Sequence, residues 1–78
     1  MTRQLAGAEI FEYNDQQYTI EVYEDRHRLR ASLYYAYCPE LDLHASPRPL
    51  YRAALRRAQE RIRRAVDEGK AKAQSEEA

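Results

Sequence analysis

The chain has 78 residues, a formal net charge of zero and one cysteine, and these properties exclude several classes of protein. A chain of this length forms a single domain with a small core. One cysteine cannot form an intramolecular disulfide and is typical of a reducing compartment. No segment reaches the roughly 20 apolar residues of a membrane span, and residues 1–10 lack the apolar stretch of a signal peptide. We therefore expect a cytoplasmic protein of bacterial or phage origin that does not contact a membrane.

The neutral total hides a segregation of charge along the chain. Residues 1–47 hold four arginines against eight acids, a net charge of −4. Residues 48–64 hold seven arginines against one acid, a net charge of +6, and residues 65–78 hold two lysines against four acids, a net charge of −2. This distribution predicts an acidic sheet and a basic helix.

Three segments of the N-terminal half have the pattern of β-strands. Residues 8–13 are the first, and the turn-forming pair Asn14 and Asp15 follows them. Residues 17–24 alternate apolar and polar side chains, as a half-buried strand does. Residues 28–38 also alternate, and Pro39 ends that strand or bends it. The side of the third strand that we expect to be buried carries Leu29, Ala31, Leu33, Tyr35 and Tyr37. Residues 40–45 are a candidate for a short extension.

A long helix is predicted in the C-terminal half. Ser46 is a good N-cap, and prolines at 47 and 49 fit the first turn, so a start anywhere from 46 to 49 fits the pattern. The apolar residues then recur with helical period in a stripe about 120° wide. This stripe consists of Tyr51, Ala54, Leu55, Ala58, Ile62, Ala65 and Val66. Gly69 is a natural end, although continuation through Lys70 and Lys72 suits the helix dipole better.

Together the segments predict an α+β fold, in which a three- or four-stranded antiparallel sheet is followed by one long C-terminal helix packed on one face (βββα). We expect residues 1–7 to be a flexible N-terminus, residues 8–69 to form the domain, and residues 70–78 to be a frayed or disordered tail. One face of the sheet stays uncovered. Because so small a core usually supplies only about 3–5 kcal/mol of stability, we also expect a homodimer.

The residue types that catalyse reactions or bind metals show no recognised spacing. Cys38 and His44 could pair, but no orienting group or oxyanion site accompanies them. His27 added to these two does not give the ligand spacing of a metal site. The only glycines, Gly7 and Gly69, exclude a glycine-rich phosphate loop. The sequence therefore predicts no catalytic residue, no metal and no cofactor, and a protein that works by binding.

The uncovered sheet face is the first candidate surface for that binding. We expect it to carry Tyr23 and Tyr34 beside Arg28 and Arg30. Tyrosine and arginine are enriched in interface hot spots, so this patch fits a homodimer or a foreign protein partner. Aromatic side chains on an open sheet can also stack nucleic-acid bases. The remaining alternative is scattered exposure with no function.

The predicted helix offers the second candidate surface. Arg52, Arg56 and Arg63 flank its apolar stripe on one side. The other side carries Arg57, Arg61 and Arg64. Clustered arginines bind nucleic-acid phosphates or an acidic protein. Equally, arginine stems cover the edges of an apolar stripe while the charge stays in water, and Arg63 is spaced for an ion pair with Asp67.

Residues 37–43 (YCPELDL) resemble the HicB-like antitoxin family. Members carry a strand that ends in an A-x-x-P-E-L segment, which is matched here by Ala36, Pro39, Glu40 and Leu41. Residues 53–55 (AAL) lie where the family has its helix signature, and the resemblance covers residues 28–66. The chain departs from the family in having HASPRP where a glycine-containing turn is usual. The resemblance implies a non-catalytic protein that holds a partner nuclease toxin inactive.

These observations predict a small protein-binding module that inhibits or neutralises a partner protein. It would be antitoxin-like, or a phage inhibitor of a host defence nuclease such as an anti-CRISPR protein. The alternative is a nucleic-acid-binding module that uses the arginine-rich helix.

Overall fold

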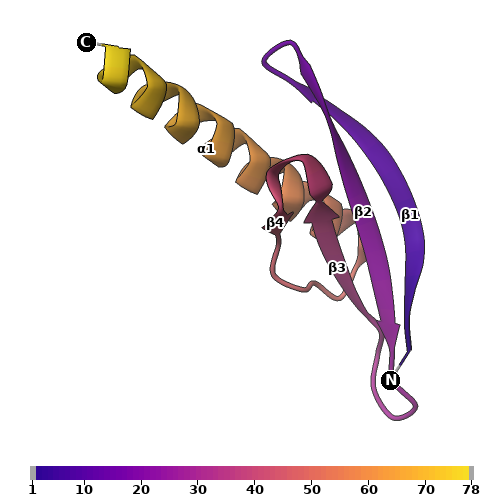
Figure 1. Cartoon of the computed structure of the whole chain (residues 1–78). Helices are drawn as coiled ribbons and strands as arrows, with labels where there is room; N and C mark the ends of the chain where they lie inside the picture. The colour runs from indigo at the N-terminus through magenta and orange to yellow at the C-terminus, as the bar shows by residue number, and fades with distance from the viewer. Residues whose placement is uncertain (1, 78) are drawn as a thin grey trace.

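The computed structural model describes the backbone of residues 2–77 and the side chains of residues 3–69. The elements follow in the order β1 (Thr2–Tyr13), β2 (Gln16–Arg26), β3 (Leu33–Cys38), the 3-10 helix η1 (Pro39–Leu41), β4 (Leu43–His44) and α1 (Tyr51–Glu77). The strands form one antiparallel sheet in the order β1-β2-β3-β4, and α1 lies across one of its faces (Figure 1). The predicted α+β fold is confirmed.

The β1–β2 hairpin turns where the sequence predicts. Asn14 and Asp15 have φ values of 56° and 63°, and two-residue hairpin turns need positive φ values that short polar side chains tolerate. The pairing then runs back to Thr2 opposite Arg26, with a bulge between Leu5 and Gly7. Residues 2–7 therefore belong to β1, and the expected strand start at residue 8, after a flexible N-terminus, is corrected.

The third strand is shorter than predicted. It starts at Leu33, and the preceding residues 27–32 form the connection from β2. Arg28 and Arg30 lie in this connection because β2 ends at Arg26 and offers them no partner strand. Leu29 between them is 97% exposed. The expected strand over 28–38 is therefore wrong in its first half.

The chain after β4 runs back along β3 before α1 begins. Arg48 and Tyr34 exchange two backbone hydrogen bonds of 2.8 and 3.0 Å. This pairing keeps the backbone extended through Arg48, which is why α1 begins at Tyr51 and not between 46 and 49. The helix passes Gly69 and ends at Glu77. The expected frayed tail over 70–78 falls outside the residues whose side chains are described.

The core lies between α1 and the face of the sheet that α1 covers. Val22 is opposite Ala36, so β3 buries Ala36 and Cys38 and turns Tyr35 and Tyr37 to the other face. This reverses the expected orientation of β3. Short side chains suit a position beneath the helix, whereas a tyrosine hydroxyl needs a polar partner or water. The buried residues are Tyr18, Ile20, Val22, Ala36, Cys38, Ala45, Ala54, Ala58 and Ile62.

Candidate protein-binding face of the sheet

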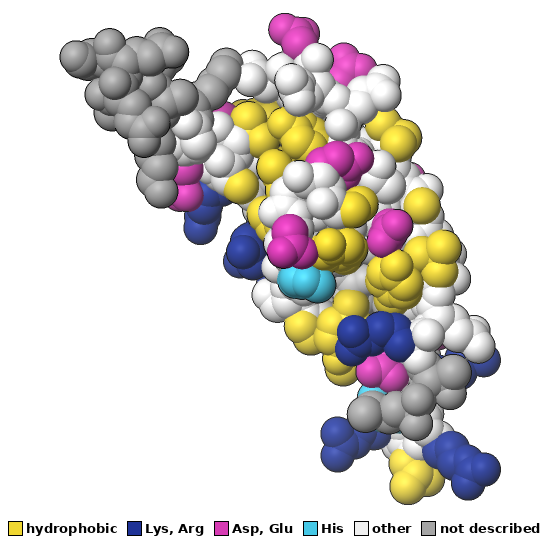
Figure 2. Space-filling view, viewed as in Figure 1, with side chains coloured by type: hydrophobic (Ala, Val, Ile, Leu, Met, Phe, Trp, Pro, Cys, Tyr) yellow, Lys and Arg dark blue, Asp and Glu magenta, His cyan; other side chains and the backbone are white. Residues whose placement is uncertain are grey.

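The sheet face opposite α1 carries a cluster of aromatic side chains. Tyr23 is opposite Tyr35, and Tyr37 is opposite His44, so the four side chains share one side of the sheet. The His44 ring packs on Tyr37 with 4.5 Å between ring centroids. We call Tyr23, Tyr35, Tyr37 and His44 the aromatic face. Figure 2 shows this side of the molecule, with yellow side chains gathered over the sheet.

A hollow of about 210 Å³ lies within the aromatic face. Its walls are Arg3, Tyr23, Tyr35, Ala36, Tyr37, His44 and Ala45. Pockets that enclose small-molecule ligands measure roughly 300–1,000 Å³. The hollow is therefore suited to a single inserted side chain of a partner.

Arg3 bridges the aromatic face and a buried acid. Its guanidinium carbon lies 4.1 Å from the centroid of the Tyr35 ring. The same guanidinium lies 3.7 Å from Oδ2 of Asp25. The other carboxylate oxygen, Oδ1, is buried and accepts no hydrogen bond from any described residue. His27 Nε2 lies 3.9 Å from this oxygen, which is too long for a hydrogen bond.

Two tyrosines of the aromatic face donate hydrogen bonds to carboxylates. The Tyr23 hydroxyl donates to Glu21 at 2.9 Å, and the Tyr37 hydroxyl donates to Asp42 at 2.9 Å. In each case the hydrogen bond to the carboxylate, followed by burial, raises the pKa of the tyrosine above 10.0. Both phenols therefore stay neutral at physiological pH.

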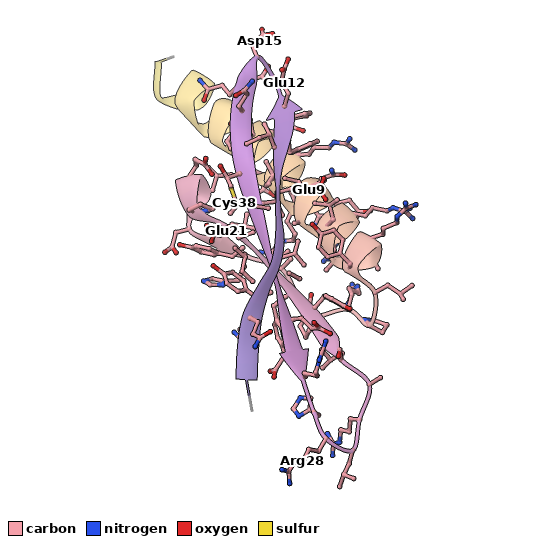
Figure 3. The ribbon with its side chains drawn as sticks, turned by 90° about the vertical axis from the view of Figure 1, so that its right-hand side faces the viewer. Glu9, Glu12, Asp15, Glu21, Arg28 and Cys38 are labelled. Carbon is pink, nitrogen blue, oxygen red and sulfur yellow. The ribbon has the colours of Figure 1, made fainter. Side chains whose placement is uncertain are left out.

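The four residues predicted to form one binding patch do not come together. Tyr23 belongs to the aromatic face. Tyr34 points to the opposite side, where its ring meets Tyr51 edge-to-face with centroids 6.1 Å apart. Arg28 and Arg30 lie in the β2–β3 connection, and Figure 3 shows Arg28 at the end of the molecule away from the hairpin turn. The predicted patch is thus divided among three places.

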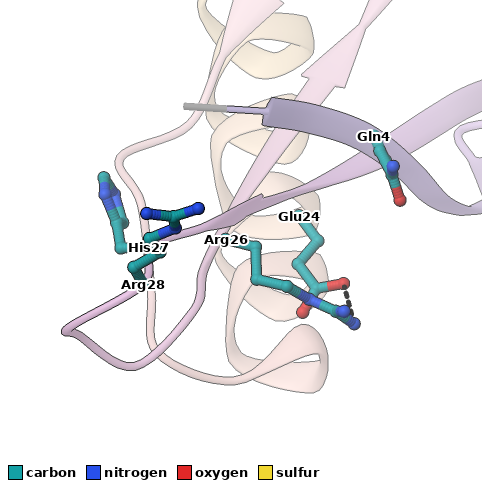
Figure 4. Close-up of a pocket in the computed structure, with 5 residues that line it drawn as sticks. All are labelled: Gln4, Glu24, Arg26, His27 and Arg28. Atoms are coloured by element: carbon teal, nitrogen blue, oxygen red, sulfur yellow. Dashed lines mark ion pairs between the residues drawn. The ribbon is translucent and has the colours of Figure 1, made fainter.

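Arg28 borders a separate polar hollow of about 230 Å³ at the end of β2 (Figure 4). Its other walls are Gln4, Glu24, Arg26 and His27. Arg26 is already paired there with Glu24 at 3.6 Å. Apart from His27, the hollow has no aromatic wall.

The predicted basic helix surface is brought together only in part. Arg52 and Arg56 line a groove of about 480 Å³ between α1 and β1, and neither makes an ion pair or hydrogen bond to another described residue. Arg63 lies instead over the rings of Phe11 and Tyr13, 5.5 and 6.0 Å from their centroids. Two of the three arginines are therefore available to a ligand.

The remaining charges of the helix are mostly used within the fold. Arg57 pairs with Glu60 at 3.4 Å, and Arg61 donates to the carbonyl of His44 at 3.2 Å. Asp67 accepts from the Tyr13 hydroxyl at 2.9 and 3.0 Å. That contact takes the place of the expected Arg63–Asp67 ion pair, which is absent from the described residues.

The Cys38 and His44 side chains lie on opposite faces of the sheet. Cys38 is fully buried beside the core, where burial raises the pKa of its thiol. His44 packs on the outer side against Tyr37. No three potential metal ligands are grouped anywhere within the described side chains.

Sequence reasoning missed Arg3, Asp25, Tyr35, Tyr37 and His44 as neighbours. The available signal was the register of the strands, because Val22 opposite Ala36 fixes every other side chain of β3.

No helix among the described residues is long and apolar enough to cross a membrane. Comparisons with protein-family models, with curated proteins and with solved structures found no match, so the resemblance to the HicB-like antitoxin family stays a prediction.

Proposed function

We propose that this chain is a small non-catalytic module that binds a partner protein through the aromatic face and inhibits or neutralises it. The resemblance to HicB-like antitoxins implies a nuclease toxin as the partner, and the alternative of a host defence nuclease rests on the small size and α+β fold of the chain. The observation that carries the proposal is the cluster of Tyr23, Tyr35, Tyr37 and His44 on the side that α1 leaves uncovered. Such side chains combine a large apolar area with a polar tip, which suits a surface that is wet when free and buried when bound.

Exposed aliphatic residues enlarge the proposed binding surface. Leu5 lies opposite Tyr23, and Ile10 lies further along β1 on the same side. Their side chains are 58% and 63% exposed. Contiguous apolar surface of this kind marks interaction sites.

The separation of Cys38 from His44 supports a binding role over a catalytic one. A histidine activates a thiol only within hydrogen-bond reach, whereas His44 lies on the other face of the sheet from the buried Cys38. A buried thiol that stays reduced also fits the cytoplasm.

The second candidate is nucleic-acid binding by α1, which is favoured by Arg52 and Arg56, since neither pairs with a described residue and both line the groove beside β1. Phosphate contacts of this kind would make the affinity fall steeply with salt concentration. Arg52→Glu combined with Arg56→Glu would abolish such binding and leave the aromatic face unchanged.

A homodimer is compatible with the proposal if it forms at the outer edge of β1. Only β2 neighbours β1 in the sheet, and long unpaired edges favour pairing with another strand. Pairing of two β1 strands about a two-fold axis would extend the sheet and leave both aromatic faces uncovered.

The test is capture of partners by the tagged chain from lysate of its native host, with and without nuclease treatment. We expect one stoichiometric protein that survives nuclease. Tyr35→Thr with Tyr37→Thr should abolish its capture, because threonine keeps the strand propensity and removes both rings. Addition of the purified chain should then suppress the activity of that partner.

The matched control is Arg52→Glu with Arg56→Glu, which alters the other candidate surface and should retain the partner. Circular dichroism checks that all variants fold. Loss of every partner on nuclease treatment, or capture that depends on the arginines and not on the tyrosines, would contradict the proposal and favour the basic helix.

A further inference from the structure

The uncovered face of the sheet is acidic. Glu12, Glu21 and Asp25 share the side of the aromatic face by their register. Glu40 and Asp42 reach it through hydrogen bonds from the Thr19 and Tyr37 hydroxyls. Among the described arginines within the strands, Arg3 is the one that the register places on that side. In Figure 2, magenta side chains lie among the yellow ones over the sheet, and the dark blue ones gather mainly at the lower end and beside the helix.

Arg3 shows which chemistry this face accepts. A guanidinium over the face of a tyrosine ring gains a cation–π interaction, and here the group also approaches the Asp25 carboxylate at 3.7 Å. The Arg3 side chain is 54% exposed, so water screens the ion pair and holds it weakly. An incoming cation can therefore share the site or displace Arg3 from it.

The acids around the aromatic face have unused acceptor capacity. A carboxylate has about four lone-pair sites, and Glu21 and Asp42 each accept one hydrogen bond from a tyrosine. The Asp25 side chain is 92% buried, yet its Oδ1 accepts none. A buried acceptor without a donor is costly, so binding that supplies one, directly or by moving Arg3 or His27, is favourable.

We propose that the partner presents a basic, extended segment whose arginine side chains stack on the tyrosines of this face and pair with Glu21, Asp25 and Asp42. This inference rests on the proposed function and adds the chemistry of the partner. The hollow of about 210 Å³ between the rings receives one such side chain. The opposite charge of the two surfaces also steers their encounter.

The same charges disfavour the other occupants of this face. Nucleic-acid phosphates would meet five carboxylates and one arginine, the reverse of a phosphate-binding surface. The basic helix of a second copy has suitable chemistry, but sheet-to-helix contact between copies is head-to-tail and leads to open assemblies unless it closes into a ring. A foreign basic segment faces no such constraint.

The test uses a short fluorescent peptide that alternates arginine and leucine, with a second peptide that has glutamate in place of each arginine. Anisotropy should show binding of the first and not the second. Glu21→Gln with Asp42→Asn should weaken binding about tenfold or more, while both tyrosine hydroxyls keep an acceptor. Glu60→Gln with Glu68→Gln changes the net charge equally on α1 and should leave the affinity nearly unchanged.

The inference would be overturned by equal binding of the glutamate peptide, by equal weakening in the α1 control variant, or by a preference for a single-stranded oligonucleotide probe. A self-association test covers the case of a second copy on this face. If Glu21→Gln with Asp42→Asn removes self-association and Ile10→Lys does not, a second copy occupies the face and the inference is overturned.

The lysate experiment separates this inference from the proposed function. A partner that is lost with Tyr35→Thr and Tyr37→Thr but kept with Glu21→Gln and Asp42→Asn would overturn the basic partner alone. A partner kept by the tyrosine variant would overturn both. A partner lost with both variants and kept by the α1 control would support both.

Discussion

Glu40 closes the edge of β2 where β3 stops. Its Oε1 accepts the backbone N–H of Thr19 at 2.9 Å, and its Oε2 accepts the Thr19 hydroxyl at 2.8 Å. The side chain thus takes the place of a strand partner for Thr19, beyond the last pair of β2 with β3, Glu21 opposite Tyr37. The two hydrogen bonds favour the charged form and lower the pKa of Glu40 below its ordinary value of 4.5.

The lowered pKa makes part of the stability depend on pH. A carboxyl whose pKa is lower in the folded state stabilises the fold. This contribution is fully present at a pH above the pKa of the unfolded state, and it disappears as the pH falls through the pKa of the folded state. We expect urea midpoints of the wild type to fall below pH 4.5 more steeply than those of Glu40→Gln. Glu12→Gln, which removes a carboxylate without a hydrogen bond to a described residue, should keep the wild-type slope. Parallel curves for wild type and Glu40→Gln would disprove this role.

Gly7 makes room for Tyr51. A methyl group at residue 7 would overlap the Tyr51 hydroxyl and lie 3.1 Å from its Cζ, so the ring would have to move and lose its hydrogen bond to Glu9. We expect Gly7→Ala to destabilise the fold by about 1–3 kcal/mol. In a double-mutant cycle the cost should shrink in a Tyr51→Leu background. An equal cost in both backgrounds would place the strain elsewhere.

At the scale of elements, a polar contact between Tyr13 and Asp67 ties the tip of the β1–β2 hairpin to α1. Tyr13 donates to both oxygens of Asp67, and Arg63 covers the stacked rings of Phe11 and Tyr13. The contact is exposed, so water screens it and its contribution to global stability is small. Its main effect is therefore on how often the hairpin tip and the last described turns of α1 separate.

We expect Asp67→Ala to speed amide hydrogen exchange at the hairpin tip and around residues 63–69, with little change in the central strands. The same variant should lower the pKa of Tyr13, because the hydrogen bond to Asp67 is the main cause of its elevation. Glu68→Ala is the control, since that acid makes no hydrogen bond or ion pair with another described residue. Uniformly faster exchange throughout the sheet would mean that the tie supports the whole fold.

The sequence predicts the elements well and the faces of the sheet poorly. Alternation in β2 and the helical period from Tyr51 are strong because apolar and polar residues separate cleanly there. In β3, both faces carry tyrosine, and hydrophobicity alone favours burial of Tyr35 and Tyr37 over Ala36 and Cys38. The outcome depends on register and on the space beneath α1, which are properties of the folded molecule. The predicted binding patch contains the same error. Alternation along β3 assigns Tyr34 to the uncovered face, whereas its side chain lies on the side that α1 covers.

At the scale of the whole molecule, the core is small for the surface that it supports. Four of its nine buried hydrophobic residues are alanines, at 36, 45, 54 and 58, and each buries little apolar area. Domains of this size are marginally stable alone. At the same time β1 is long and unpaired on its outer side, with Ile10 exposed beside it. Pairing between two β1 edges would bury additional surface and stabilise both copies.

A dimer of this kind couples stability to concentration. Association favours the folded state by mass action, so we expect the urea midpoint to rise with protein concentration and sedimentation to show a monomer–dimer equilibrium. Ile10→Lys places a charge at the edge of β1, a feature that natural proteins use to block edge pairing, and should remove both effects. Leu41→Lys, at a partly exposed leucine in η1, should leave them unchanged. A midpoint independent of concentration, together with a monomer in sedimentation, would show that the small core suffices by itself.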